Sequence, residues 1–138
     1  MIVHSDWKRD EVFEATTQDG KSIIIDADSA HTDGAGPLQV ILMALCSCTS
    51  VDVVSILKKK RQQLTALRVT ARATQAETPP RIFTHIFLTY AVSGRLSRKA
   101  VEDAVSLSKN KYCSVSKMLE KATTIDYEIV YTDGEPEA

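Results

Sequence analysis

The chain has 138 residues, a length typical of one domain, with 17 Lys and Arg against 18 Asp and Glu. This near-neutral balance argues against a dedicated nucleic-acid-binding protein, which usually carries a basic excess. Three cysteines are too few for a secreted disulfide scaffold, and no charged-then-apolar leader opens the sequence. We therefore expect a single soluble domain over residues 1–138, located in the cytoplasm.

The first part of the chain is expected to form a β-hairpin. Residues 10–17 alternate loosely between apolar and polar side chains, and residues 21–27 contain a β-branched run at 23–25. Between them Asp19 and Gly20 are typical turn residues. Two short strands joined by such a turn predict a hairpin.

A long helix is predicted over residues 37–62. Pro37 suits the first helical position, where its missing N–H costs nothing, and the basic cluster at 58–61 complements the helix dipole at the other end. The first four turns are apolar on nearly every face, so they must be covered on all sides. This predicts either a central core helix or a subunit interface.

The same apolar stretch is not expected to span a membrane. A bilayer span needs about 20 predominantly apolar residues. Four polar residues interrupt this stretch: Gln39, Ser47, Ser50 and Asp52.

The second half of the chain is expected to form strands over residues 64–77 and 82–92, the second closed by Gly94. Ser97 is a good N-cap for a helix over 98–109. After this helix we expect a linker at 110–112, a short helix over 114–121, a strand over 125–131 and a frayed tail at 133–138. The resulting order, β-β-α-β-β-α-α-β, is typical of an α+β fold.

The cysteines are the residues most able to carry chemistry. Cys46 and Cys48 are two apart on a helix and point to different faces, so at most one of them shares a site with Cys113. Cys113 lies at the start of a short helix, where thiolate is favoured. Asp52 is four residues after Cys48 on the same face, and a carboxylate there disfavours thiolate unless a cation offsets it. Plain packing of each thiol stays an alternative, because free cysteines are often buried.

Several segments of the chain resemble the OsmC/Ohr family, the osmotically inducible and organic-hydroperoxide-resistance proteins. The similarity covers nearly the whole chain, and its two cysteine motifs are the specific part. The similar segments are GP at 36–37, LMALCSCT at 42–49, VDVVSILKKKR at 51–61, PPRIFTHIFLTYAVSG at 79–94 and NKYCSVSKMLEKA at 110–122.

The resemblance implies an OsmC-like fold with a long central helix, assembled as an intertwined homodimer with its sites at the interface. It also implies peroxidase chemistry without a cofactor or metal. Cys48 would attack a hydroperoxide and become a sulfenic acid, and Cys113 would resolve it as a disulfide. A low-molecular-weight or lipoyl-type dithiol would then reduce that disulfide.

The sequence departs from this pattern at two supporting positions. Catalytic members carry an arginine near the first hairpin and a glutamate just after the proline that opens the helix. Here the candidate cations are Arg9 and Lys21, and Gln39 follows Pro37 and Leu38. This motivates a second hypothesis, a non-catalytic or weakly active dimer that binds a small apolar or electrophilic ligand.

Overall fold

The computed structural model describes residues 1–132, which form two compact units, Met1–Leu42 and a second unit that begins at Met43. The long helix α1 (Pro37–Lys59) begins in the first unit and continues in the second. The frayed tail expected at 133–138 lies outside the described residues. A single domain over the whole chain stays a prediction.

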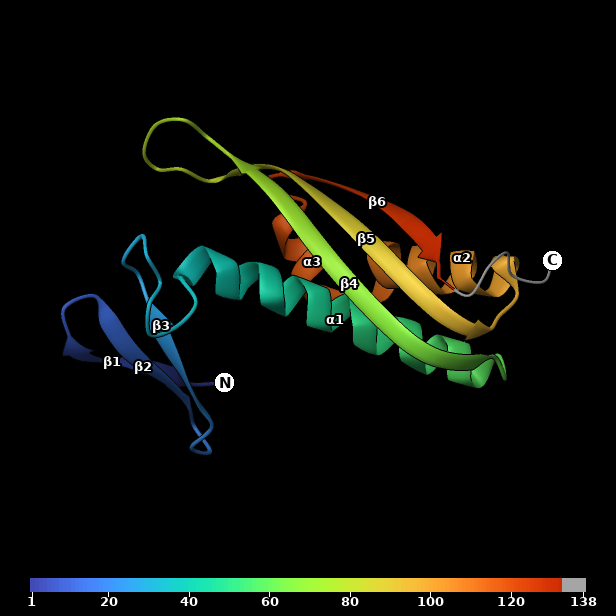
Figure 1. The fold of residues 1–138 in the computed structure, drawn as a ribbon, viewed down its shortest axis with the longest axis horizontal. Coiled ribbons are helices and arrows are strands. Elements are labelled where there is room, and N and C mark those ends of the chain that lie inside the picture. Colours follow the sequence, from blue (N-terminus) through green and yellow to red (C-terminus); the bar gives the residue numbers. More distant parts are fainter. Residues whose placement is uncertain (133–138) are drawn as a thin grey trace. The chain divides into compact units, whose positions relative to one another are not determined.

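The first unit contains an antiparallel sheet in the order β1-β2-β3 (Figure 1). Its strands are β1 (Val3–Arg9), β2 (Val12–Thr17) and β3 (Ser22–Asp26). The predicted hairpin is confirmed as the β2–β3 pair, and Gly20 in its turn has a φ of +91°, which favours glycine.

Strand β1 was missed by the sequence reading. All seven of its residues are exposed, and six of them pair with β2. A strand with no buried face has no alternating apolar pattern, so the pairing of its backbone with β2 is the feature that identifies it.

The second unit contains a sheet in the order β4-β5-β6, in which β4 and β5 are antiparallel and β5 and β6 are parallel. Helical segments connect the parallel pair, as a parallel crossover requires. The elements after α1 are β4 (Gln63–Gln75), β5 (Phe83–Arg95), α2 (Arg98–Leu107), the π-helical turn η1 (Ser108–Tyr112), α3 (Ser114–Leu119) and β6 (Thr124–Tyr131).

These elements confirm the α+β class and the expected long helix, with two local corrections. The segment predicted as a linker at 110–112 is part of η1, which continues α2 in a wider turn. Gly94 lies inside β5 instead of closing it, at a register shift opposite Leu64, with a φ of +128°. Ser97 is the N-cap of α2, as predicted, and accepts a hydrogen bond from the Ala100 N–H.

The core of the second unit lies between the sheet and its helices. One stripe of α1, repeating every four residues, is buried: Leu45, Thr49, Val53 and Leu57. It packs in one core with apolar residues of β5 and α2, among them Ile86, Leu88, Tyr90, Val92, Val101 and Val105. By length and composition α1 could also cross a membrane. The packed stripe and the polar pairing of Asp52 described below favour a core helix.

Candidate redox site

The structure brings Cys48 of α1 and Cys113 together in the second unit. The Cys48 side chain adjoins the Cys113 thiol and acts on its pKa. Cys113 is fully buried, whereas Cys48 is half-buried. Two cysteines that are far apart in sequence therefore meet with one of them still reachable from outside.

Cys113 is positioned by the chain on both of its sides. Its N–H donates to the Ser108 carbonyl at 2.8 Å, which ends η1. Its sulfur accepts a hydrogen bond from the Ser116 N–H at 3.3 Å and so acts as the N-cap of α3. The sequence reading expected a cysteine at this helix start, and the structure confirms that placement.

Burial raises the pKa of the Cys113 thiol well above its usual range, and the Ser116 N–H offsets this only in part. The neighbouring Cys48 side chain raises the pKa further, as does the charge of Asp52. The expectation that the helix start favours a thiolate at Cys113 is thus wrong, because desolvation outweighs it.

Cys46 has different surroundings from Cys48, in line with the two-residue spacing. Burial raises the pKa of the Cys46 thiol, and a hydrogen bond from the backbone of Ala71 in β4 opposes this rise. Its sulfur thus contacts the sheet.

Asp52 belongs to a polar cluster that the sequence reading did not anticipate. Its carboxylate accepts a hydrogen bond from the Ser108 hydroxyl at 2.8 Å. The Ser108 and Thr49 hydroxyl oxygens lie 2.7 Å apart, and Thr49 lies 2.7 Å from the Tyr90 hydroxyl. The one sequence feature that could have indicated this cluster is Thr49, a polar residue in the apolar stripe of α1.

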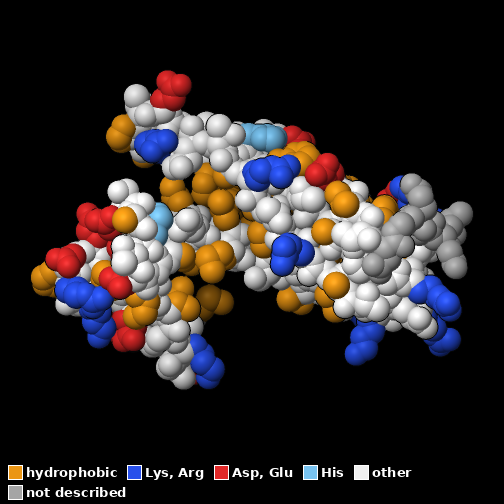
Figure 2. All heavy atoms as spheres, in the orientation of Figure 1, with side chains coloured by type: hydrophobic (Ala, Val, Ile, Leu, Met, Phe, Trp, Pro, Cys, Tyr) orange, Lys and Arg blue, Asp and Glu red, His pale blue; other side chains and the backbone are white. Residues whose placement is uncertain are grey.

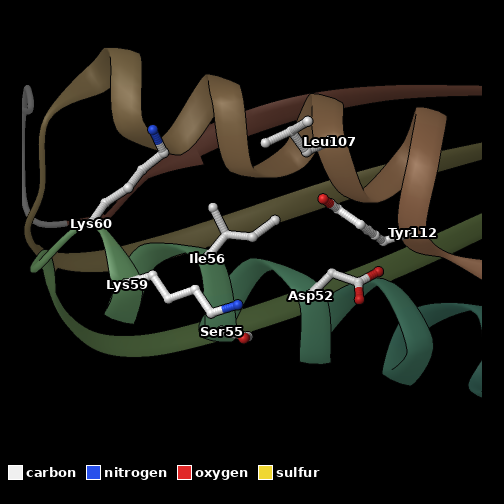
Figure 3. Close-up of a pocket in the computed structure, with 7 residues that line it drawn as sticks. All are labelled: Asp52, Ser55, Ile56, Lys59, Lys60, Leu107 and Tyr112. Carbon is white, nitrogen blue, oxygen red and sulfur yellow. The ribbon is translucent and has the colours of Figure 1, made fainter.

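A pocket of about 380 Å³ opens beside this cluster, between α1 and the α2–η1 segment (Figure 3). Asp52 and Tyr112 form one end of it and are close in the chain to the two cysteines. Lys59 and Lys60 lie at the other end, with apolar side chains between. Its lining residues are Asp52, Ser55, Ile56, Lys59, Lys60, Leu107 and Tyr112.

The two candidate cations belong to the first unit, and each has an acidic partner there. The Arg9 guanidinium lies 3.2 Å from the Asp33 carboxylate, and the Lys21 ammonium lies 3.7 Å from Asp19. Both pairs are largely exposed, so each contributes little to stability and is easily exchanged.

Gln39 caps the start of α1. Its side-chain oxygen accepts a hydrogen bond from the Gly36 N–H at 2.8 Å. This is the reach-back half of a capping box, in which a residue in the first helical turn satisfies a free donor.

Two histidines, His31 and His85, have structural partners. The Nδ1 atom of His31 lies 2.7 Å from the Asp26 carbonyl, and His85 lies 2.8 Å from the Asp126 carboxylate. Within residues 1–132, no group of three or more His, Cys, Asp or Glu is placed to hold a metal ion.

Comparison with known proteins identifies similar chains and folds. A family model described as OsmC-like protein matches residues 30–128. Protein YhfA of Escherichia coli K12 is 42% identical over 127 residues, which cover 90% of this chain and 94% of that protein.

Two solved structures illustrate the range of similarity. A hypothetical protein from Aquifex aeolicus VF5 is 31% identical with a TM-score of 0.82, over 94% of this chain and 96% of that one. An organic hydroperoxide resistance protein OsmC from Legionella pneumophila is 15% identical with a TM-score of 0.71, over 94% and 95%. The second similarity shows the fold alone.

Proposed function

Because the chain belongs to the OsmC-like protein family, we propose that it is a thiol-dependent peroxidase that reduces organic hydroperoxides in the stress response. Cys48 and Cys113 are its redox pair. The observation that carries this proposal is that the Cys48 side chain adjoins the buried Cys113 thiol and acts on its pKa. A thiol already in contact with its partner can resolve an oxidised sulfur before a second peroxide reaches it.

In the first step the Cys48 thiolate attacks the distal oxygen of the hydroperoxide. A sulfur–oxygen bond forms, the oxygen–oxygen bond breaks, and the alkoxide leaves as an alcohol after taking a proton. Cys48 is now a sulfenic acid. Cys113 then attacks the Cys48 sulfur, a disulfide forms, and water leaves. An external dithiol reduces the disulfide by thiol exchange and is itself oxidised.

The surroundings of the two thiols support this division of roles. Cys48 is half-buried, so it can meet a substrate. Cys113 is fully buried and held protonated by desolvation, which suits a thiol that reacts second.

The test is limiting oxidation followed by peptide mapping. One equivalent of cumene or tert-butyl hydroperoxide is expected to produce a disulfide between Cys48 and Cys113 and to leave Cys46 free to be alkylated. Cys48→Ser abolishes peroxide turnover with a dithiol, Cys113→Ser stops at a sulfenic acid, and Cys46→Ser is the matched control that retains turnover. Recovery of Cys48 and Cys113 as free thiols after oxidation contradicts the proposal.

Arg9 and Lys21 are the candidate cations for stabilising a Cys48 thiolate, since both are exposed and loosely paired. We compare Arg9→Gln with Lys21→Gln in single-turnover oxidation of Cys48. The residue whose loss slows this step about tenfold supports the thiolate, and equal rates in all three proteins exclude both.

We also propose that the protein is a cytoplasmic homodimer. Apolar side chains on α1 outside the buried stripe are open to solvent: Met43 is 57% exposed, Val51 66% and Val54 45%. Hydrophobic side chains reach the surface in Figure 2. The sheet of the first unit adds a mostly apolar pocket of about 610 Å³. Uncovered apolar surface of this kind is typical of a protein interface.

The second candidate function is ligand binding without turnover. The pocket of about 380 Å³ favours it, because it can hold a small ligand beside Asp52 and Tyr112. Steady-state turnover of hydroperoxide with a dithiol, faster than in Cys48→Ser, decides against this candidate.

A further inference from the structure

The polar cluster around Ser108 has a defined direction. A carboxylate can only accept hydrogen bonds, so the Ser108 hydroxyl donates to Asp52 over 2.8 Å. Its oxygen is then free to accept from the Thr49 hydroxyl, which in turn accepts from the Tyr90 hydroxyl, each over 2.7 Å. The chain of donors therefore begins at Tyr90 in the sheet and ends on the Asp52 carboxylate.

Ser108 also holds Cys113. Its side chain is fully buried and bound to Asp52, and its carbonyl accepts the Cys113 N–H at 2.8 Å. Asp52 follows Cys48 by four residues, so the two side chains lie on the same face of α1, one turn apart. A single buried serine thus fixes the carboxylate and the second cysteine relative to the first.

We propose that Asp52, held in place by Ser108, is the proton acceptor for the Cys113 thiol when Cys113 attacks oxidised Cys48. This inference rests on the proposed function. The attacking species must be a thiolate, yet Cys113 is fully buried and has no direct access to solvent. The Asp52 carboxylate is bound to Ser108, the residue that also binds the Cys113 N–H, and its charge acts on the Cys113 thiol.

The step balances without any further reagent. The Cys113 proton moves to the Asp52 carboxylate as the Cys113 sulfur bonds to the Cys48 sulfur. The sulfur–oxygen bond of the sulfenic acid breaks, and the departing hydroxide takes the proton from Asp52 and leaves as water. Asp52 lines the pocket in Figure 3, which supplies an exit for that water.

Other charged and titratable groups surround this step. They are Cys48 and Lys59 on α1, Lys60 directly after it, Tyr112 of η1 and Tyr90 through Thr49. The two lysines lie at the far end of the pocket from Tyr112 (Figure 3).

Two possible effects of Asp52 have opposite signs, which makes the test decisive. If Asp52 is only a fixed negative charge, its neutralisation favours the Cys113 thiolate and speeds disulfide formation. If Asp52 is the base, its neutralisation slows this step, since general-base catalysis typically contributes about 10²–10⁴-fold.

The experiment measures disulfide formation after a single stoichiometric oxidation, in a Cys46→Ser background, from pH 6 to 9. Asp52→Asn is expected to slow this step at least tenfold at neutral pH and to steepen its rise with pH. The amide can still accept from Ser108, which protects the fold. Ser108→Ala, with the Asp52 charge retained, is expected to slow it as well. Ser106→Ala, in the preceding helix α2, is the control and keeps the wild-type rate.

A second probe separates this inference from the proposed function. Cys48 is converted to a mixed disulfide with thionitrobenzoate, and release of that thiolate reports attack by Cys113 without any peroxide. If peroxide fails to oxidise Cys48 in the wild-type protein, the peroxidase proposal is wrong. The rate of thionitrobenzoate release still tests whether Asp52 accepts the Cys113 proton. Release from Asp52→Asn at the wild-type rate or faster overturns the inference.

Discussion

The hydroxyl oxygens of Thr49 and Tyr90 lie 2.7 Å apart, so a buried hydrogen bond joins α1 to the central strand β5. Burial raises the pKa of Tyr90 to about 12. Tyr90 therefore connects the packing of α1 against β5 to the stability of the second unit at high pH.

The first prediction concerns Tyr90→Phe. At pH 7 the loss of the buried hydrogen bond is expected to cost about 1 kcal/mol in the free energy of unfolding. An unfolded tyrosine ionises near pH 10 and folded Tyr90 near 12, so its contribution is complete below pH 10 and is lost as pH rises to 12. Urea denaturation at several pH values should show a smaller alkaline fall in Tyr90→Phe than in wild type.

Tyr127→Phe is the matched control for this substitution. The Tyr127 ring packs edge-on against Tyr90, with ring centres 5.9 Å apart, and phenylalanine preserves that ring. A control that loses as much stability as Tyr90→Phe would contradict the role given to the Thr49 hydrogen bond.

The second prediction concerns Asp26, which is buried in the first unit. Its carboxylate accepts hydrogen bonds from the Asp33 and Asp28 N–H groups, which lower its pKa. The stability it contributes is present above the unfolded value of about 3.9 and is lost as pH falls through the folded value. Asp26→Asn should melt at a lower temperature than wild type at pH 7, with a smaller difference below pH 4. A constant difference across this range would contradict the assignment.

The third prediction compares two glycines of positive φ. At Gly94 an added Cβ would lie 2.0 Å from the Gln63 carbonyl oxygen, whereas at Gly20 no atom lies within 4 Å. Both substitutions strain the backbone, but Gly94→Ala also needs β4 and β5 to separate. We expect Gly94→Ala to cost well over 1 kcal/mol and Gly20→Ala about 1 kcal/mol, measured by urea denaturation. Equal losses of stability in the two variants would contradict this prediction, because they would show that β4 and β5 move apart at Gln63 without cost.

The fourth prediction tests the homodimer. Val51 is 66% exposed on an apolar face of α1, so Val51→Glu should place a charge in the interface and dissociate the dimer. Asn110→Glu makes the same charge change at an exposed position of η1 and should leave the mass unchanged. Light scattering coupled to size exclusion gives the mass. A wild-type monomer, or a dimeric Val51→Glu, contradicts the proposal.

Local patterns predicted most of the elements, because hydrophobic period, turn chemistry and capping act over a few residues. The β2–β3 hairpin, the long helix and the Ser97 cap followed from such signals. Strand β1 did not, because it is exposed along its whole length and its pairing with β2 is a tertiary fact.

The candidate site was likewise predicted from the sequence only in part. Helical spacing alone separated Cys46 from Cys48 and placed Asp52 on the face of Cys48. The sequence could not show that burial overrides the helix start at Cys113, since desolvation depends on all the elements packed around the thiol. Nor could it join Tyr90, Thr49 and Ser108, because hydroxyl groups from β5, α1 and η1 meet only when the sheet and helices pack together.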